Sequence, residues 1–205
     1  MPVRLLLVRH GQSTWNAGGR WQGWADPPLS DLGRTQAAEA VGRLAGLGLS
    51  SLTASDLNRA RTTAAIVGEG LGLGSAAVDA DLREYDVGEW EGLTRPEIEA
   101  GWPDHLDAWR KGRLPATPGG ETRLAFLARV TAGLVRAAAS DDDAVLVVTH
   151  GGVIRAAEQV AGAERTPVID NLSGRWFTVD AAGSVHAGVV VVTLSPDVRT
   201  SSPSL

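Results

Sequence analysis

The chain of 205 residues has the length of one large domain, and its 43% apolar and 21% charged residues are ordinary for a globular protein. Its net charge of −5 argues against a general nucleic-acid-binding surface, so an anionic ligand would need a local cluster of positive side chains. The sequence has no cysteine, which excludes disulfides, thiol nucleophiles and cysteine-ligated metals. We expect a cytoplasmic protein without a signal peptide or a membrane-spanning segment.

Apolar runs alternate with amphipathic stretches along the chain. The first strand is expected over residues 3–8, and Ser30 is a suitable N-cap for the helix that follows at 31–44. Because strands that alternate with helices form parallel sheets, the sequence predicts an α/β fold with a mostly parallel central sheet flanked by helices on both faces. The later expected elements are strand 49–54, helix 58–69, strand 76–78, helix 121–139, strand 144–149, helix 152–161, and strands 175–179 and 185–194.

Residues 79–120 interrupt this alternation. Trp, Pro and Gly recur there, with short helical pieces expected near 95–100 and 104–110. An insertion of this length inside a compact domain is typical of a lid or a binding loop. We therefore expect a single domain over residues 1–205 with a lid or specificity insertion at 79–120. The long apolar strand at 185–194 is either paired inside the sheet or covered in a dimer contact, which leaves a homodimer open.

Two apolar strands of the sequence end in a histidine that glycine follows. The first strand runs into Arg9 and His10, and strand 144–149 runs into His150. Because ligands of open α/β sheets bind beyond the carboxyl ends of the strands, both histidines are expected at one rim. Arg59 follows the second strand and Glu84 follows the third, so we expect both side chains to reach the same rim.

Two histidines, two arginines and a carboxylate at one edge describe a phosphate pocket. Arginine forks match the geometry of phosphate, and glycines after the histidines let backbone N–H groups approach a ligand. The helix that begins after Gly151 adds a dipole that favours an anion. Each residue alone has a plainer explanation. A strand-end histidine is more often a structural residue than a catalyst, and a lone Arg59 or Glu84 would be an ordinary helix or surface residue.

The segments that hold these residues resemble the histidine phosphatase superfamily, which has the phosphoglycerate mutase-like fold. Five blocks occur in the order in which the family carries them, and so ordered a set is hard to explain by chance. The blocks are LVRHGQSTWN at 7–16, QGWADPPLS at 22–30, SDLNRA at 55–60, LRE at 82–84 with GEWEGL at 88–93, and THGG at 149–152.

The resemblance implies a role for each residue of the predicted pocket. His10 is the nucleophile, whose neutral imidazole attacks phosphorus and forms a phosphohistidine. The sequence does not identify the partner that fixes the other ring nitrogen, for which a backbone carbonyl is one candidate. Glu84 protonates the leaving oxygen and later takes a proton from the attacking water. Arg9, Arg59 and His150 hold the phosphoryl oxygens. No metal or other cofactor is implied. The further phosphate-binding residues that the resemblance implies are Asn16, Gln22, Gly23 and Gly151.

The implied activity is that of a metal-independent phosphatase acting on small phosphorylated metabolites, either sugar phosphates or phosphoglycerate-like esters. Mutases of the family tend to be longer and to carry more basic residues in the lid. The phosphatase-type branch is therefore favoured here, and a small-molecule ester is the expected partner. A phosphoglycerate mutase, and a phosphate-binding regulatory protein without turnover, are the alternatives. The basic residues of this lid are Arg95, Arg110, Lys111 and Arg113.

Finer features of the lid leave the substrate open. LREYDVGEWEGLT at 82–94 and PGGE at 118–121 most resemble broad-specificity, glucosyl-3-phosphoglycerate and ribazole-phosphate phosphatases. The sequence does not select among these substrates, because one fold serves many of them. Trp24 near the expected site and Trp102 in the lid would suit stacking on a sugar ring.

Overall fold

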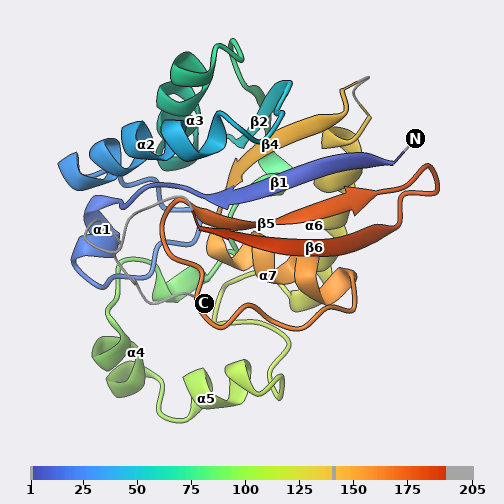
Figure 1. Cartoon of the computed structure of the whole chain (residues 1–205). Helices are drawn as coiled ribbons and strands as arrows, with labels where there is room; N and C mark the ends of the chain where they lie inside the picture. Colours follow the sequence, from blue (N-terminus) through green and yellow to red (C-terminus); the bar gives the residue numbers. More distant parts are fainter. Residues whose placement is uncertain (1, 140–141, 193–205) are drawn as a thin grey trace.

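The computed structural model describes residues 2–139 and 142–192 (Figure 1). In this part of the chain one six-stranded sheet has the strand order β3-β2-β4-β1-β5-β6. Strands β1 to β4 pair in parallel, whereas β5 and β6 join by antiparallel pairing. The predicted α/β class with a mostly parallel central sheet is confirmed. The strands are β1 (Val3–Arg9), β2 (Ser51–Ser55), β3 (Ala77–Asp79), β4 (Ala144–Thr149), β5 (Ser173–Val179) and β6 (Val185–Val192).

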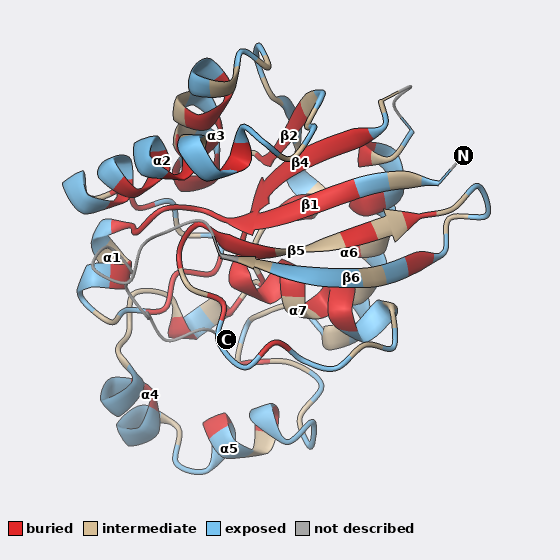
Figure 2. Ribbon diagram, in the orientation of Figure 1, coloured by how far each residue is buried: buried red, intermediate tan, exposed pale blue. Residues whose placement is uncertain are grey.

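The central strands are buried on both faces (Figure 2). Successive side chains of a strand point to opposite sides, so an unbroken apolar run supplies two cores at once. In β1, Leu5 and Leu7 pack into one apolar cluster, while Leu6 and Val8 pack into the other. The helices that complete these clusters are α6 (Arg123–Ala137) and α7 (Gly151–Val160) on the first side, and α2 (Asp31–Leu44) and α3 (Asn58–Leu71) on the second.

The register of the two central strands brings their ends together. Strands β1 and β4 run parallel with Arg9 opposite Thr149, so His10 and His150 leave the sheet at the same level. The backbone N–H of His10 donates to the carbonyl of Thr149 at 2.9 Å and continues the ladder by one bond. Strand β2 flanks β4 on its other side, which places the β2–α3 connection at the same rim.

The segment 79–120 is irregular but well packed. Trp90 at its centre is fully buried and makes edge-to-face contacts with Trp21, Trp102 and Trp109. Helices α4 and α5 lie apart from the sheet, on the side where β1 and β4 end (Figure 1). After β3, segment 79–120 contains the 3₁₀ turns η1 (Ala80–Leu82) and η2 (Gly88–Trp90) and the helices α4 (Arg95–Gly101) and α5 (His105–Arg110).

Most expected elements are present, with ends that differ by a few residues. Helix α2 has the expected bounds, and the hydroxyl of Ser30 caps it by accepting from the N–H of Gly33. Between β1 and α2, where the sequence predicts no helix, the structure has a four-residue helix, α1 (Thr14–Ala17), which is too short to show a helical period in the sequence. The end of the last expected strand, 193–194, lies outside the described residues. No helix within the described ranges is long and apolar enough to cross a membrane.

Candidate active site

The imidazoles of His10 and His150 lie against each other beyond the ends of β1 and β4. Their ring centroids are 5.1 Å apart at an interplanar angle of 65°, and both side chains are buried. The glycine after His10 has a packing role that the sequence interpretation missed. A Cβ at Gly11 would lie 2.5 Å from the carbonyl oxygen of Gly33 in α2, and the N–H of Gly11 donates to the hydroxyl of Thr63. The idea that this N–H approaches a ligand is wrong.

The hydrogen bonding of His10 determines which ring nitrogen carries a proton. Its Nδ1 lies 2.6 Å from the carbonyl oxygen of Gly11, and a carbonyl can only accept, so Nδ1–H donates. The partner that the sequence did not identify is therefore a backbone carbonyl, and Nε2 keeps its lone pair. Burial, together with the positive charges of Arg59 and Arg9, holds the pKa of His10 well below its usual 6.5. The imidazole is thus neutral near pH 7 and able to act as a nucleophile.

Arg59 lies in the first turn of α3, and its guanidinium is held by backbone carbonyls. Nη1 donates to Ala25 at 2.7 Å and Nη2 donates to Gly23 at 2.8 Å. Gly23 has φ = +50°, and a Cβ there would meet a carboxylate oxygen of Glu91 at 2.5 Å, so this turn requires glycine. Burial lowers the pKa of Arg59 to about 10, which leaves the side chain charged at neutral pH.

His150 forms a hydrogen bond with Ser55 at the end of β2. The hydroxyl of Ser55 accepts weakly from the N–H of Leu57 at 3.4 Å and lies 2.9 Å from Nε2 of His150, to which its own proton can be donated. Nδ1 then carries the ring proton, and it is buried without a partner among the described residues. Burial is the main cause that holds the pKa of His150 well below 6.5, with Arg59 and His10 adding to it.

Glu84 enters from the loop after β3. One carboxylate oxygen accepts from the N–H of Tyr85 at 2.8 Å, and the other accepts from the N–H of Gly152 at 3.1 Å in the first turn of α7. A Cβ at Gly152 would lie 2.0 Å from the Glu84 carboxylate, so the second glycine after His150 is needed to admit the acid.

Arg129 of α6 anchors the loop that carries Glu84, and no sequence motif pointed to it. Its guanidinium donates to the carbonyls of Asp81 at 2.9 Å, Arg83 at 2.7 Å and Glu84 at 2.7 Å, and it pairs with Glu121. Three carbonyls on one guanidinium fix the path of the loop. The position of the Glu84 carboxylate is therefore set from both its backbone and its side chain.

A small cavity of about 30 Å³ lies between these groups. Except for His150, which contacts the ring of His10, every site residue expected from the sequence lines this cavity. Arg9 is buried there, and its Nη1 donates to the carbonyl of Ile169 at 2.8 Å. The complete lining consists of Arg9, His10, Asn16, Arg20, Trp21, Gln22, Gly23, Arg59, Glu84 and Gly151.

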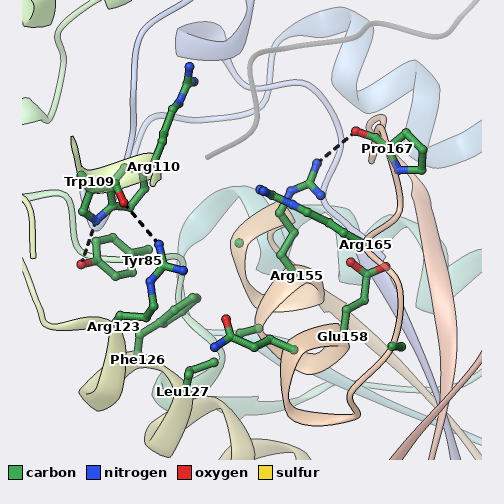
Figure 3. Close-up of a pocket in the computed structure, with 14 residues that line it drawn as sticks. Tyr85, Trp109, Arg110, Arg123, Phe126, Leu127, Arg155, Glu158, Arg165 and Pro167 are labelled. Carbon is green, nitrogen blue, oxygen red and sulfur yellow. Dashed lines mark hydrogen bonds between the residues drawn. The ribbon is translucent and has the colours of Figure 1, made fainter. Parts of the chain in front are cut away.

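A larger cavity of about 600 Å³ lies beside the loop that carries Glu84 (Figure 3). Its lining includes Tyr85 and Gly152, whose N–H groups bind the carboxylate of Glu84. Four arginines line the larger cavity: Arg110 of α5, Arg123 of α6, Arg155 of α7 and Arg165 of the loop after α7. All but Arg110 were not singled out from the sequence, because they lie in no motif.

The other basic residues of segment 79–120 are paired with carboxylates. Arg95 binds Glu99 at 2.7 Å, and both Lys111 and Arg113 bind Asp107. The tryptophans considered for sugar stacking have protein partners. Trp102 packs on Trp90. The ring of Trp24 lies against the guanidinium groups of Arg83 and Arg129, and its Nε1–H donates to the Glu84 carbonyl at 2.9 Å.

Within residues 2–139 and 142–192, no three or more His, Cys, Asp or Glu side chains are grouped so as to hold a metal ion. The positive charge at the small cavity comes instead from Arg9 and Arg59.

Residues 5–174 match the histidine phosphatase superfamily (branch 1). A glucosyl-3-phosphoglycerate phosphatase of Mycobacterium tuberculosis is 41% identical over 165 residues, which cover 75% of this chain and 72% of that protein. A 2,3-bisphosphoglycerate-dependent phosphoglycerate mutase of Methylobacterium sp. is 35% identical over 195 residues, or 91% of this chain and 93% of the mutase.

Solved structures show the same relationship. The mycobacterial glucosyl-3-phosphoglycerate phosphatase in complex with VO3 superposes with a TM-score of 0.79 at 35% identity, covering 94% of this chain and all of that one. A protein described as mycobacterial hydrolase 1 superposes with a TM-score of 0.82 at 33% identity, covering 95% of this chain and all of its own.

Proposed function

The chain belongs to branch 1 of the histidine phosphatase superfamily and is a phosphatase of small phosphate esters, and we propose that it acts without a metal, through a phosphohistidine on His10. The observation that carries the proposal is the protonation state of the His10 imidazole. Its Nδ1–H is committed to a backbone carbonyl, so Nε2 is a neutral nucleophile beside two buried guanidinium groups.

The first step transfers the phosphoryl group to the enzyme. The guanidinium groups of Arg9 and Arg59 bind the phosphoryl oxygens and stabilise the charge of the transition state, as Mg²⁺ does in other phosphoryl-transfer enzymes. Nε2 of His10 attacks phosphorus as the bond to the ester oxygen breaks. Glu84, in its protonated form, gives its proton to the leaving oxygen, so the alcohol departs neutral.

The second step returns the enzyme to its starting state. A water molecule attacks the phosphohistidine, and the Glu84 carboxylate takes the proton that the water loses. The phosphorus–nitrogen bond breaks, inorganic phosphate forms, and His10 regains its lone pair. The carboxylate is already oriented for both transfers by the N–H groups of Tyr85 and Gly152.

Neutral donors complete the proposed phosphate pocket. The side-chain oxygen of Asn16 accepts from the N–H of Ser13, and that of Gln22 accepts from the Ser13 hydroxyl. Both amide NH₂ groups are therefore left to donate to phosphoryl oxygens. Gly151 at the first turn of α7 adds the positive end of a helix dipole, and Nδ1–H of His150 adds a further donor.

The relatives suggest which substrate to try first. Proteins named glucosyl-3-phosphoglycerate phosphatase share about two fifths of the aligned sequence, so we propose a sugar-linked phosphoglycerate or a similar ester, with 79–120 acting as the lid over it. The mutase relatives share less. A mutase would be activated by 2,3-bisphosphoglycerate, and we expect no such activation here. Cytoplasmic location, a homodimer and the absence of nucleic-acid binding stay predictions from the sequence.

Hydrolysis of p-nitrophenyl phosphate in the presence of EDTA tests the proposal. We expect turnover by the wild type and a loss of at least about 10⁴-fold in His10→Ala, because the nucleophile is gone. His105→Ala is the matched control, since His105 is an exposed histidine of the lid. Equal turnover by His10→Ala and the wild type, or turnover that EDTA abolishes, would contradict the proposal.

A further inference from the structure

We infer that Glu91, the residue after the 3₁₀ turn η2, is a positioning residue for the proposed phosphoryl transfer. Its carboxylate holds the backbone turn at 23–25, and this turn holds the guanidinium of Arg59. The inference rests on the proposed function, in which Arg59 binds the phosphoryl group. Glu91 is not among the residues that line the small cavity, so it acts through Arg59.

The carboxylate of Glu91 binds the turn at two successive residues. The N–H groups of Trp24 and Ala25 both donate to Oε1, the second at 2.9 Å, and the second is shared with the carbonyl of Gln22. Successive N–H groups that converge on one point form a concave site for an anion. A Cβ at Gly23 would lie 2.5 Å from the same oxygen, so the turn and the carboxylate are in direct contact.

The backbone on both sides of Glu91 is fixed. Trp90, which precedes it, is fully buried, and the N–H of Gly92, which follows it, donates to the carbonyl of Trp21 at 2.9 Å. The carboxylate is therefore presented to the turn from a well-packed part of segment 79–120.

One peptide group connects Glu91 with Arg59. The N–H of Trp24 and the carbonyl of Gly23 belong to the same peptide. This N–H donates to Glu91, while this carbonyl accepts from Nη2 of Arg59 at 2.8 Å. The carbonyl of Ala25 accepts from Nη1 of Arg59 at 2.7 Å. A peptide between an anion and a cation is polarised by both, so each hydrogen bond strengthens the other.

The guanidinium of Arg59 depends on these carbonyls for its position. Among the described residues no carboxylate forms an ion pair with it, and its Nε–H is buried without a partner there. Burial lowers the pKa of Arg59 to about 10, and nearby carboxylates, Glu91 among them, oppose that shift. A direct ion pair would occupy donors that a phosphoryl group needs, whereas a carboxylate one peptide away supports the charge without occupying them.

The other end of the turn is attached separately. Oδ1 of Asp26 accepts from the N–H of Asn58 at 2.7 Å, which joins this end to the first residue of α3. Loss of the Glu91 carboxylate should therefore loosen one side of the turn while the other side stays attached. We expect the chain to fold without it, with the guanidinium of Arg59 less well positioned.

Three substitutions of Glu91 test this role with p-nitrophenyl phosphate. Glu91→Ala should lower kcat/KM roughly 10²-fold, the cost of an error of about 1 Å in a catalytic group. Glu91→Gln keeps an oxygen that can accept from both N–H groups, so we expect a loss of less than about tenfold. Glu91→Asp keeps the charge but withdraws the oxygen from the turn. It should resemble Glu91→Ala, and it replaces that variant if Glu91→Ala does not fold.

Glu89→Ala is the matched control. Glu89 is an exposed residue of the turn η2 itself, so its loss removes a carboxylate two positions away without touching the turn at 23–25. Its kcat/KM should equal that of the wild type. Melting temperatures, measured for all variants, identify those that are folded at the assay temperature.

A double-substitution cycle shows whether Glu91 acts through Arg59. We expect Glu91→Ala to change kcat/KM by less than about twofold in the Arg59→Ala background, because the guanidinium that it positions is already gone. A residue that serves only stability would lose the same factor in both backgrounds.

The possible failures are distinguishable. Wild-type kcat/KM in Glu91→Ala, the same loss in Glu91→Gln as in Glu91→Ala, or equal losses in the two Arg59 backgrounds would each overturn the inference while leaving the phosphatase intact. If the wild type did not hydrolyse the ester, the proposed function would fail. The dissociation constant of inorganic phosphate, which needs no turnover, would then test Glu91. It should rise about tenfold in Glu91→Ala, and an unchanged value would overturn the inference.

Discussion

The small and the large cavity are linked through the hydrogen bonds of Glu84, but they differ in construction. In the small one, His10 and Arg59 are buried, and backbone carbonyls hold both side chains before any substrate arrives. In the large one, Arg110 and Arg165 are exposed and Arg123 is half-buried. Reaction chemistry needs fixed geometry, whereas recognition of a leaving group tolerates adaptable side chains. Side chains that line the large cavity can therefore differ between relatives without disturbing the small cavity.

The largest effect after loss of the nucleophile is expected from Glu84→Gln. An amide cannot protonate the leaving oxygen, so kcat/KM on an alkyl phosphate should fall by roughly 10²- to 10⁴-fold. p-Nitrophenolate is a stable anion that leaves without a proton, so kcat/KM on p-nitrophenyl phosphate should fall much less. The comparison uses kcat/KM because this parameter reports the steps up to phosphoryl transfer. Equal losses of kcat/KM on the two esters would show that Glu84 does not protonate the leaving oxygen.

Gly152→Ala in α7 should displace the Glu84 carboxylate from the side of that helix. The added Cβ would lie 2.0 Å from the Glu84 carboxylate and must displace it, and an error of about 1 Å in a catalytic group costs roughly 10²-fold in rate. The helix itself should not suffer, because alanine is the better helix former. Activity and melting temperature are measured together, with Gly42→Ala in α2 as control, where a Cβ meets nothing within 4 Å. Full activity in Gly152→Ala would contradict the placement of Glu84.

The smallest effect concerns stability and depends on the buried histidines of the small cavity. Because the folded-state pKa values of His10 and His150 lie well below 6.5, only the unfolded chain takes up their protons just below that pH. The free energy of unfolding should therefore be unaffected by these histidines above pH 6.5, and should fall by at most about 1.4 kcal/mol per histidine per pH unit below it.

Urea unfolding at pH 7.5 and pH 5.5 measures this loss. His150→Asn should lose less free energy of unfolding than the wild type between these two pH values, because one of the proton uptakes has been removed. His186→Asn is the control, since His186 is an exposed histidine far along the chain from the site. The same pH dependence in all three proteins would mean that the buried histidines are not held neutral by the fold.

The contrast between the cavities also explains what could be predicted from the sequence. Unbroken apolar runs placed β1 and β4 well, and an apolar stripe of helical period placed α2, since each pattern is local. The residues of the small cavity follow strand ends within contiguous motifs, so topology alone gathers them at one rim. Helix α1 was missed because four residues cannot show a period.

Arginines of the large cavity could not be predicted in this way. Arg123 and Arg155 lie on separate helices, α6 and α7, and nothing in their local sequence distinguishes them from solvated helix residues. Arg129, which binds the Glu84 loop, is equally silent. The role of Gly11 was misinterpreted for a related reason, because the close approach of Gly33 is a tertiary contact between distant segments.

Trapping the phosphoenzyme is the most direct test of the central claim. Rapid acid-free quenching after reaction with a ³²P-labelled ester should yield a label that is stable to alkali, labile to acid and located on the peptide that contains His10. Glu84→Gln should accumulate more of this label when p-nitrophenyl phosphate is the donor, because its second step is slowed. His10→Ala should carry none. Turnover without any protein-bound label, or a label on another residue, would contradict the proposed mechanism.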